Sequence, residues 1–317
     1  MHHFLFLLFL FSSSLMAQEW PSRQIRIIVP FAPGGIADTS SRTIADKLGA
    51  RLGQPVLVEN RAGASGNIGS EMVAKSAPDG YTLLLGYDGT LVVNPHVYAK
   101  VPFDTLRDFQ AVTKLGDSPV IIVAHPSVPA NNLRELIALS KAKPGTLSYG
   151  TAGTGSTPHL VGEMLNQRVG TDFQHVPYKG GGQAMGDVVG GQIPLVMTAI
   201  ATSQQFLKSG RVKGLGLSSS VRSPAVPEVP TFIESGLEGM VVNTWVGILA
   251  PAKTPRPIVD RLQREIAAVL KEPDVRERYA VLGIDPVGNT PDEYGAQIRA
   301  DLALWGPIVK RAGIRIE

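Results

Sequence analysis

The sequence predicts an α/β protein built from two units, each with a mostly parallel sheet flanked by helices. Apolar, β-branched segments alternate with helical segments along both halves of the chain, which is typical of parallel strands joined by helical crossovers. A Gly-rich stretch joins a strand to a helix once in each half, in VPFAPGGIADTSSR (Val29–Arg42) and in TLSYGTAGTGSTPHL (146–160). Ligands of parallel sheets bind beyond the carboxyl ends of the strands, so two such loops facing each other would form a cleft.

Composition places the chain among soluble globular proteins. Of its 317 residues, 44% are hydrophobic and 18% are charged, with a net charge of +3, so disorder is not expected. No basic run exceeds two residues, which argues against a nucleic-acid partner because phosphate binding needs clustered Lys and Arg. The absence of Cys from the sequence excludes disulfides, thiolate catalysis and Cys-ligated metals.

Residues 1–17 are interpreted as a cleavable signal peptide, which predicts an exported protein. Phe4–Phe11 is an unbroken apolar run that is too short to span a bilayer. Ser12–Ser14 break the run, and Ala17 supplies the small residue expected before a cleavage site. Gln18 stands where a lipoprotein would carry Cys, so no lipid anchor is expected.

The first half of the chain contains three expected strands and two expected helices. In order, these are a strand at Ile25–Pro30, a helix capped by Asp38 or Thr39 that runs to about Leu52, a strand at 55–60 (PVLVEN), a Gly-rich loop and helix within 63–78 (GASGNIGSEMVAKSAP), and a strand at 81–87 (YTLLLGY). The strands are predicted from β-branched and apolar residues, and the helices are predicted from cap residues and hydrophobic periodicity.

The second half repeats this layout and adds two helices. In order, we expect a strand at 119–126 (PVIIVAHP), a helix capped by Asn131 or Asn132 that runs to about Lys143, a strand, Gly-rich loop and helix start within 146–160, a strand at 172–178, a loop and helix within 180–191, strands at 193–200 and 212–219, an amphipathic helix at 255–271, and a last helix at 290–313 capped by Thr290.

Gly34 and Gly35 lie between the first strand and the first helix. They can adopt positive φ and expose backbone N–H groups just before a helix N-terminus, where donors are unpaired and the dipole favours anions. The stretch is therefore either a carboxylate-binding loop or a tight turn. Asp38 is interpreted as a cap or as a structural brace of this loop, because a second carboxylate would repel an anionic ligand.

The stretch Tyr149–His159 adds hydroxyl donors to its glycines, namely Thr151, Thr154, Ser156 and Thr157. It falls short of G-x-G-x-x-G because Pro158 occupies the third glycine position, and it lacks the lysine of a P-loop. The density of donors favours anion binding over a plain turn.

Two further positions are candidates for the cleft. Tyr178 precedes three glycines and is expected to line the cleft, whereas the neighbouring Lys179 is expected at the surface. Asp88 and Thr90 in GYDGT follow the third strand, at the mouth of the first sheet. Asp88 is either a turn residue that bonds its own backbone or an acceptor for a ligand amine or hydroxyl.

The sequence contains few patterns that are typical of catalytic or metal-binding sites. The sequence has no G-x-S-x-G elbow and no H-E-x-x-H, and His96, His125, His159 and His175 lack i, i+4 pairing. Ser156 and His159 lie one helical turn apart, so an exported hydrolase is conceivable, but no orienting acid is apparent. We therefore expect no enzyme activity, no cofactor and no metal.

Together these motifs resemble the tripartite tricarboxylate transporter substrate-binding proteins of the Bordetella uptake gene (Bug, TctC-like) type. The resemblance covers almost every residue after Ala17, in order, and its matching stretches are WPSRQIRIIVPFAPGGIAD, LGQPVLVENRAGASGNIG, APDGYTLLLG, NPHVY, YGTAGTGSTPHL, VPYKGGGQAMGDVVGGQIP, VPTFIESG, WVGILAPAKTP and the helix that contains Trp305.

The resemblance implies a periplasmic, monomeric binding protein of the two-domain, type II Venus-flytrap fold, with a mixed, mostly parallel sheet in each domain. Domain 1 would contain residues 18–118 plus 245–317 and domain 2 residues 119–244, with crossings near Ser118 and Thr244. By motif matching, the ligand contacts would be Phe31, Ala32, Gly34, Gly35, Asp88, Thr90, Thr151, Ala152, Gly153, Thr154, Gly155, Ser156, His159 and Tyr178.

The resemblance also implies a function. The protein would capture a small organic anion (a mono- or dicarboxylate, amino acid or aromatic acid) between its two Gly-rich loops, close by a hinge motion and deliver it to the membrane permease subunits of a transporter. Asp88 departs from the family pattern, which usually has a small neutral residue there, and this favours a ligand with an amine or a hydroxyl. Two alternatives stay open: a sensor that presents its closed form to a sensor kinase, and the hydrolase.

Overall fold

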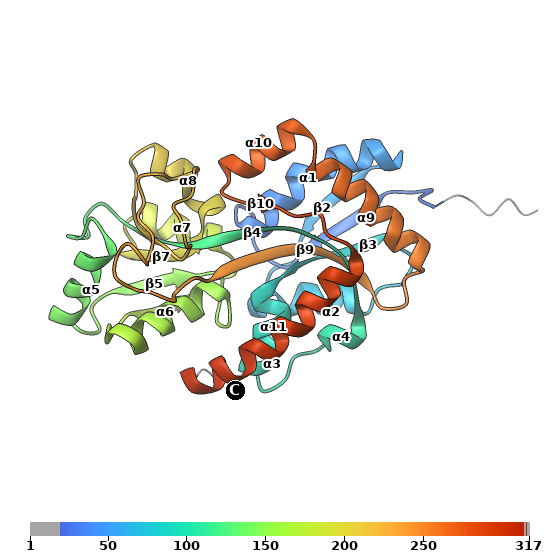
Figure 1. Cartoon of the computed structure of the whole chain (residues 1–317). Coiled ribbons are helices and arrows are strands. Elements are labelled where there is room, and N and C mark those ends of the chain that lie inside the picture. The colour runs from blue at the N-terminus through green and yellow to red at the C-terminus, as the bar shows by residue number, and fades with distance from the viewer. Residues whose placement is uncertain (1–19, 314, 316–317) are drawn as a thin grey trace, which may run out of the picture.

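The computed structural model describes residues 20–313 and residue 315. It has two groups of helices at opposite ends of one mixed sheet (Figure 1). We call the part built on β1 (Ile25–Val29), β2 (Val56–Asn60) and β3 (Thr82–Tyr87) the first lobe. The part built on β5 (Ser148–Thr151), β6 (Gln174–Pro177) and β7 (Leu195–Ala199) is the second lobe. The predicted signal peptide lies outside the described residues.

Each lobe contains a three-stranded parallel sheet, as the alternation of strands and helices predicts. In the first lobe β1 lies between β2 and β3, and Ile27 is in register with Val58 on one side and Leu83 on the other. In the second lobe β5 lies between β6 and β7 in the same parallel sense. Ligand-facing loops at the carboxyl ends of these strands can thus meet from both lobes.

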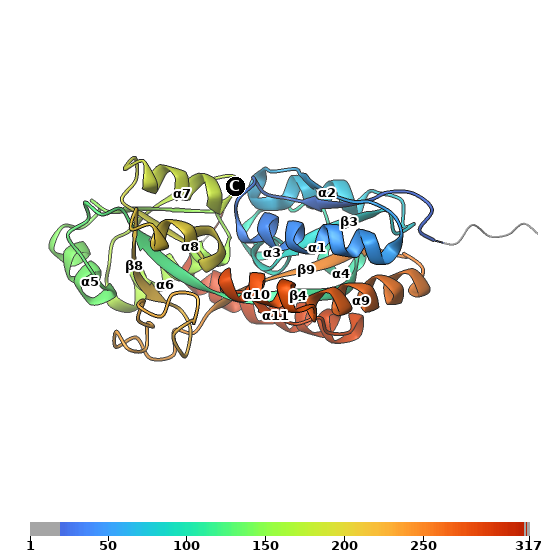
Figure 2. The same cartoon turned by 90° about the horizontal axis from the view of Figure 1, so that it is seen from above.

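Two long strands, β4 (Phe109–Ala124) and β9 (Asn243–Pro251), join the lobes. Figure 2 shows β4 running from one lobe into the other. Residues 109–119 of β4 pair with β9 in the first lobe, and residues 120–124 pair with β7 and with β8 (Lys213–Leu217) in the second. The whole sheet has the order β2-β1-β3-β9-β4-β7-β5-β6, and β8 and β10 (Asp285–Pro286) both pair with β4.

The strand predicted at 119–126 was too short, because β4 begins ten residues before Pro119. Gly116 and Pro119 read as breakers in sequence, and the pairing with β9 shifts register between Ala111 and Thr113 and between Lys114 and Gly116. Because of these irregularities, apolar and polar residues do not alternate regularly along β4, so the sequence pattern does not predict its first part as a strand. The division into domains at Ser118 and Thr244 stays a prediction.

Helices cover both faces of the sheet in each lobe. The first lobe has α1 (Ile36–Leu52), α2 (Asn67–Ala74), α3 (Asn94–Val97), α4 (Thr105–Asp108), α9 (Arg256–Leu270), α10 (Pro273–Val281) and α11 (Pro291–Ala312), with the short helical turns η1 (Ala64–Gly66) and η2 (Gly89–Val93). The second lobe has α5 (Leu133–Ala142), α6 (Thr157–Val169), α7 (Gly181–Val189) and α8 (Ile200–Lys208). Sequence reasoning missed the nine-residue helices α8 and α10, the four-residue helices α3 and α4, and the strands β9 and β10.

The cap predictions have mixed outcomes. Asn132 caps α5, and Thr290 forms a capping box with Glu293 at the start of α11, as predicted. The expectation that Asp38 or Thr39 caps α1 was wrong, because the helix begins earlier and Gly35 is its N-cap. Gly35 has an extended backbone that any residue could adopt, so the sequence offers no cap signal there.

In the described part of the chain, no helix combines the length and the apolar character needed to cross a membrane. Within the same residues, no group of three His, Asp or Glu side chains is placed to hold a metal ion.

A candidate ligand cleft between the two lobes

A narrow cavity of about 20 Å³ lies between the lobes. This volume has room for about one water molecule. The residues that line the cavity are Phe31, Gly35, Ile36, Ala37 and Tyr87 from the first lobe and Ala152, Pro158, Gly181, Thr198, Ala199 and Thr202 from the second. The lining is mostly apolar and contains no Asp, Glu, Lys, Arg or His. The negative charge of an anionic ligand would therefore have to be stabilised there by hydrogen bonds from neutral donors.

Four helices begin beside this cavity, because residues at their N-termini form part of its lining. They are α1, α6, α7 and α8, and their N-cap residues, none of which makes a side-chain cap hydrogen bond among the described residues, are Gly35, Ser156, Gly180 and Ala199. First-turn N–H groups lack intrahelical partners, and the helix dipole places partial positive charge at this end. Converging N-termini of this kind bind anions.

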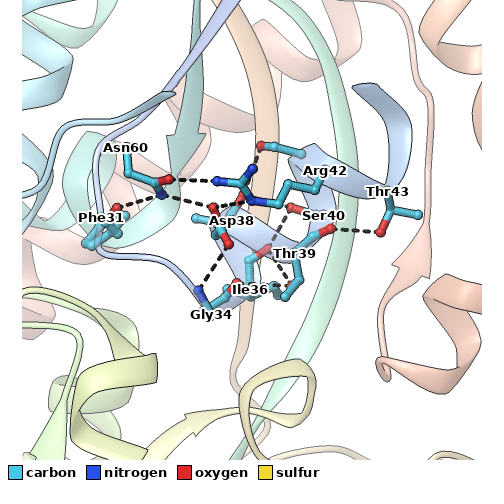
Figure 3. Close-up of polar contacts among 12 residues, drawn as sticks. Phe31, Gly34, Ile36, Asp38, Thr39, Ser40, Arg42, Thr43 and Asn60 are labelled. Carbon is cyan, nitrogen blue, oxygen red and sulfur yellow. Dashed lines mark hydrogen bonds and ion pairs between the residues drawn. The ribbon is translucent and has the colours of Figure 1, made fainter. Parts of the chain in front are cut away.

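The first loop (Phe31–Gly35) is held by a network centred on Asp38 (Figure 3). One Asp38 oxygen accepts from the Gly34 N–H at 3.1 Å, and the other accepts from Arg42 Nε at 2.9 Å and Asn60 Nδ2 at 3.0 Å. Asn60 Nδ2 also donates to the Phe31 carbonyl at 3.0 Å. Burial by itself would raise the pKa of Asp38, but the bonds from Arg42, Asn60 and Gly34 outweigh it and lower that pKa. Asp38 is therefore an ionised brace with both oxygens engaged.

The second loop (Thr151–Ser156) uses most of its own hydroxyls to hold its shape. Thr151 Oγ1 accepts from the Gly153 N–H at 3.1 Å and lies 2.7 Å from His175 Nε2. Ser156 Oγ donates to the Gly153 carbonyl at 2.7 Å. The hydroxyls of Thr151, Ser156 and Thr157, which sequence reasoning offered as ligand donors, are thus engaged within the protein. Ala152 is the residue of this loop that lines the cavity, and Thr154 does not line it.

His159 and His175 stack on each other behind this loop, with ring centroids 3.9 Å apart. His159 Nδ1 accepts from the Gly155 N–H at 3.2 Å. Burial lowers the pKa of His159 to about 4, and burial together with the neighbouring His159 lowers the pKa of His175 to about 3. Both imidazoles are therefore neutral near pH 7, and the hydrogen bonds of the described residues do not pair His159 with Ser156.

Asp88 has a different environment from the one the sequence suggested. It is fully buried and does not line the cavity. One of its oxygens accepts from the hydroxyl of Thr157 at the start of α6, and the other accepts from Thr244 Oγ1 at 2.7 Å. Burial raises the pKa of Asp88 to about 7. Asp88 thus connects the first lobe, the second lobe and β9.

Two other expected contacts are also engaged elsewhere. Thr90 Oγ1 donates to the Ser65 carbonyl at 2.8 Å. Tyr178 donates its hydroxyl to Asp187 at 2.6 Å. Neither residue lines the cavity.

The backbones of the two lobes touch directly around the cavity. The Ala32 N–H donates to the Lys179 carbonyl at 3.0 Å, from the first lobe to the second. A Cβ added to Gly89 would lie 2.8 Å from the Cα of Ser156. Gly89 of GYDGT is therefore needed for the close approach of the second lobe, a role that the sequence analysis did not predict.

Sequence reasoning found part of the cavity and missed the rest. Phe31, Gly35 and Ala152 line it, whereas the lining residues that were not anticipated are Ile36, Ala37, Tyr87, Pro158, Gly181, Thr198, Ala199 and Thr202. Tyr87 is the last residue of the expected strand 81–87, and Thr198 lies two residues before the end of the expected strand 193–200. The rule that ligands bind at the carboxyl ends of parallel strands could therefore have found them.

Comparison with known proteins places the chain in a family. The family model described as "Tripartite tricarboxylate transporter family receptor" matches residues 40–314. Protein BugT of Bordetella pertussis is 36% identical over 307 residues, which cover 96% of this chain and 94% of BugT.

Solved structures agree with this match. The periplasmic binding protein BugD has a TM-score of 0.90 at 35% identity, over 94% of this chain and all of BugD. An R. palustris protein, Rpa4515, solved with adipate has a TM-score of 0.91 at 32% identity, over 94% of this chain and 99% of Rpa4515. MatC from Rhodopseudomonas palustris with bound malate has a TM-score of 0.87 at 33% identity, over 92% of this chain and all of MatC.

These values confirm the predicted fold, that of a periplasmic binding protein, and the resemblance found in the sequence motifs. With a match over most of its length in both sequence and structure, the chain belongs to the tripartite tricarboxylate transporter receptor family.

Proposed function

We propose that this protein is a periplasmic receptor that captures a small organic carboxylate in the cavity between its lobes. The observation that carries the proposal is the convergence of the N-termini of α1, α6, α7 and α8 on a cavity with no cationic side chain in its lining. Backbone N–H groups at helix N-termini bind carboxylates without a lysine or arginine. The adipate and malate in two structural neighbours support this ligand class.

The first carboxylate of the ligand would lie between the first loop and the second loop. Asp38 holds the first loop in place by accepting the Gly34 N–H, and the free backbone N–H groups in the first turns of α1 and α6 would donate to the ligand. Charge-assisted hydrogen bonds contribute about 1.5–3 kcal/mol each. Three or four of them would offset the cost of ordering the ligand and leave micromolar affinity or better.

Binding would require the lobes to move apart and close again. A cavity of about 20 Å³ is too small for an organic acid. β4 and β9 join the lobes and would be the hinge, which corresponds to domain 1 at 18–118 plus 245–317 and domain 2 at 119–244. A ligand that bridges both lobes favours the closed form, since only that form offers both sets of donors. The closed form would then deliver the acid to the permease subunits of a tripartite tricarboxylate-type transporter.

A thermal-shift screen of the protein without residues 1–17, against organic acids and amino acids, tests the binding step. Malate and adipate are the first probes, and titration calorimetry then measures their dissociation constants. A ligand at 100 times its dissociation constant adds about 2.7 kcal/mol to the free energy of unfolding. Absence of any shift or heat with carboxylates would overturn the proposal. Loss of uptake of the same acid after deletion of the gene would support the delivery step.

A further inference from the structure

The hydroxyl of Thr202 is buried at the cavity and has no hydrogen-bond partner among residues 20–313. Thr202 lies in the first turn of α8, is 4% exposed and lines the cavity with Thr198 and Gly181. Leaving a buried hydroxyl without a partner destabilises the folded state, so most such groups in folded proteins are paired. An unpaired hydroxyl at a cavity wall indicates that its partner comes from the cavity.

Thr202 also lacks the local bond that helical threonines usually make. In α1, Thr39 donates to the carbonyl of Gly35 at 3.0 Å, and Thr43 donates to that of Thr39 at 2.8 Å, each four residues back. The residue four positions before Thr202 is Thr198, which still belongs to β7 and pairs with Ile121. Thr202 therefore lacks the helical carbonyl four residues back, and its hydroxyl bonds to no other described residue although Thr202 lines the cavity.

Thr198 places a second hydroxyl beside the first. A Cβ added to Gly181 would lie 2.8 Å from Thr198 Oγ1 and 3.5 Å from Thr202 Oγ1, so both hydroxyls lie against the first residue of α7. The N-termini of α7 and α8, which both lack a side-chain cap, flank the pair. Two hydroxyl donors in the positive potential of two helix N-termini suit a negatively charged oxygen.

We propose that Thr202, with Thr198 beside it, binds the second carboxylate of a dicarboxylate ligand and sets the preference for dicarboxylates over monocarboxylates of equal length. The proposal rests on the function proposed above, in which the first carboxylate lies between the first and second loops. The cavity lining contains no Asp or Glu. An ammonium group would find no charged partner there, whereas a carboxylate oxygen accepts bonds from hydroxyls and backbone N–H groups.

The test compares Thr202→Val, which keeps the shape and removes the hydroxyl, with Thr202→Ser, which keeps the hydroxyl. Titration calorimetry measures three pairs of acids: succinate and butyrate, glutarate and valerate, and adipate and hexanoate. In the wild type, at least one dicarboxylate is expected to bind more tightly than its monocarboxylate partner. A hydrogen bond to a charged group is worth about 1.5–3 kcal/mol, so Thr202→Val should weaken that dicarboxylate about tenfold to a hundredfold.

Three further readouts make the result specific. Monocarboxylate affinity should change less than about twofold in Thr202→Val, and Thr202→Ser should restore dicarboxylate binding. The unfolding midpoint of ligand-free Thr202→Val should be unchanged or higher, because the buried hydroxyl has no partner to lose. Thr43→Val, which removes a helical hydroxyl that donates within α1, is the matched control and should bind as the wild type does.

The outcomes separate this proposal from the function on which it rests. If no carboxylate binds the wild type, the proposed function fails and this proposal fails with it. If carboxylates bind but Thr202→Val weakens both members of a pair equally, or weakens neither, the receptor function stands and the role of Thr202 is refuted. Equal wild-type affinity for a dicarboxylate and its monocarboxylate partner in every pair would refute it too.

Discussion

Gly182 in α7 faces Pro33 in the first loop so closely that a Cβ on Gly182 would lie 2.5 Å from the Pro33 carbonyl oxygen. This approach joins the backbone of the second lobe to that of the first. A contact of this length is too short for any real Cβ atom, and its partner is backbone that cannot rotate away. Glycine at position 182 thus sets how closely the lobes can meet.

We therefore expect Gly182→Ala to weaken ligand binding about tenfold, because overpacking of about 1–3 kcal/mol would oppose closure. Titration calorimetry with the acid found in the screen measures the change. Gly186→Ala lies in the same helix, where an added Cβ meets no atom within 4 Å, so it should bind normally. Equal affinities of the two variants would show that the lobes do not meet in this way when ligand is bound.

Thr157→Val should destabilise the protein, because it removes one of the two hydroxyls that donate to the buried Asp88 carboxylate. A buried carboxylate that loses a donor costs about 1–3 kcal/mol or more. Urea denaturation at pH 8, where Asp88 is ionised, measures the free energy of unfolding. Thr157→Ser keeps the donor and should retain most of the stability. A valine variant as stable as the serine variant would contradict this role of Thr157.

Asp88→Asn should raise the free energy of unfolding above pH 7. Burial raises the pKa of Asp88 to about 7, from its usual value of 3.8. Between these values the folded state holds the proton and the unfolded state releases it, so the contribution of Asp88 to stability falls as the pH rises from about 3.8 to 7. An asparagine has no charge to bury, so its advantage over the wild type should grow across this range. Parallel stability curves from pH 4 to pH 8 would contradict the prediction.

The buried histidines should have the opposite effect on stability. Burial lowers the pKa of His159 to about 4 and that of His175 to about 3, from 6.5. The unfolded state therefore binds more protons than the folded state below pH 6.5. Their stabilising contribution is fully present above pH 6.5 and is lost as the pH falls toward 4.

The two effects overlap, so the histidines are best measured in the Asp88→Asn background. There, unfolding free energies from urea titrations should rise with pH between about 4 and 6.5. Adding His175→Gln should make this rise shallower, by removing one group that takes up a proton on unfolding. An unchanged slope would mean that His175 is protonated in the folded protein.

Several features of the site could be read from the sequence because they depend on neighbouring residues. β-branched runs predicted β1, β3 and β7, and cap residues predicted the starts of α5 and α11. The Gly-rich stretches marked where these strands lead into helices at the cavity. The quoted motifs also identified the family, which the comparisons confirm.

Other features depend on contacts between distant parts of the chain. The sequence allows Asp88 to be either a turn residue or a ligand contact, and its partners in the structure, Thr157 and Thr244, are 69 and 156 residues away. Thr202 follows an expected strand and carries no signal of its own in the sequence, and only the meeting of β7, α7 and α8 places its unpaired hydroxyl at the cavity.

The sequence by itself thus determined most of the strands and helices, the Gly-rich loops and the family, because propensity and spacing act over a few residues. Tertiary structure decided which polar groups are satisfied within the protein and which face the cavity. A hydrogen bond requires two groups to come within about 3 Å, and for Asp88 and Thr202 that distance is set by the packing of the lobes.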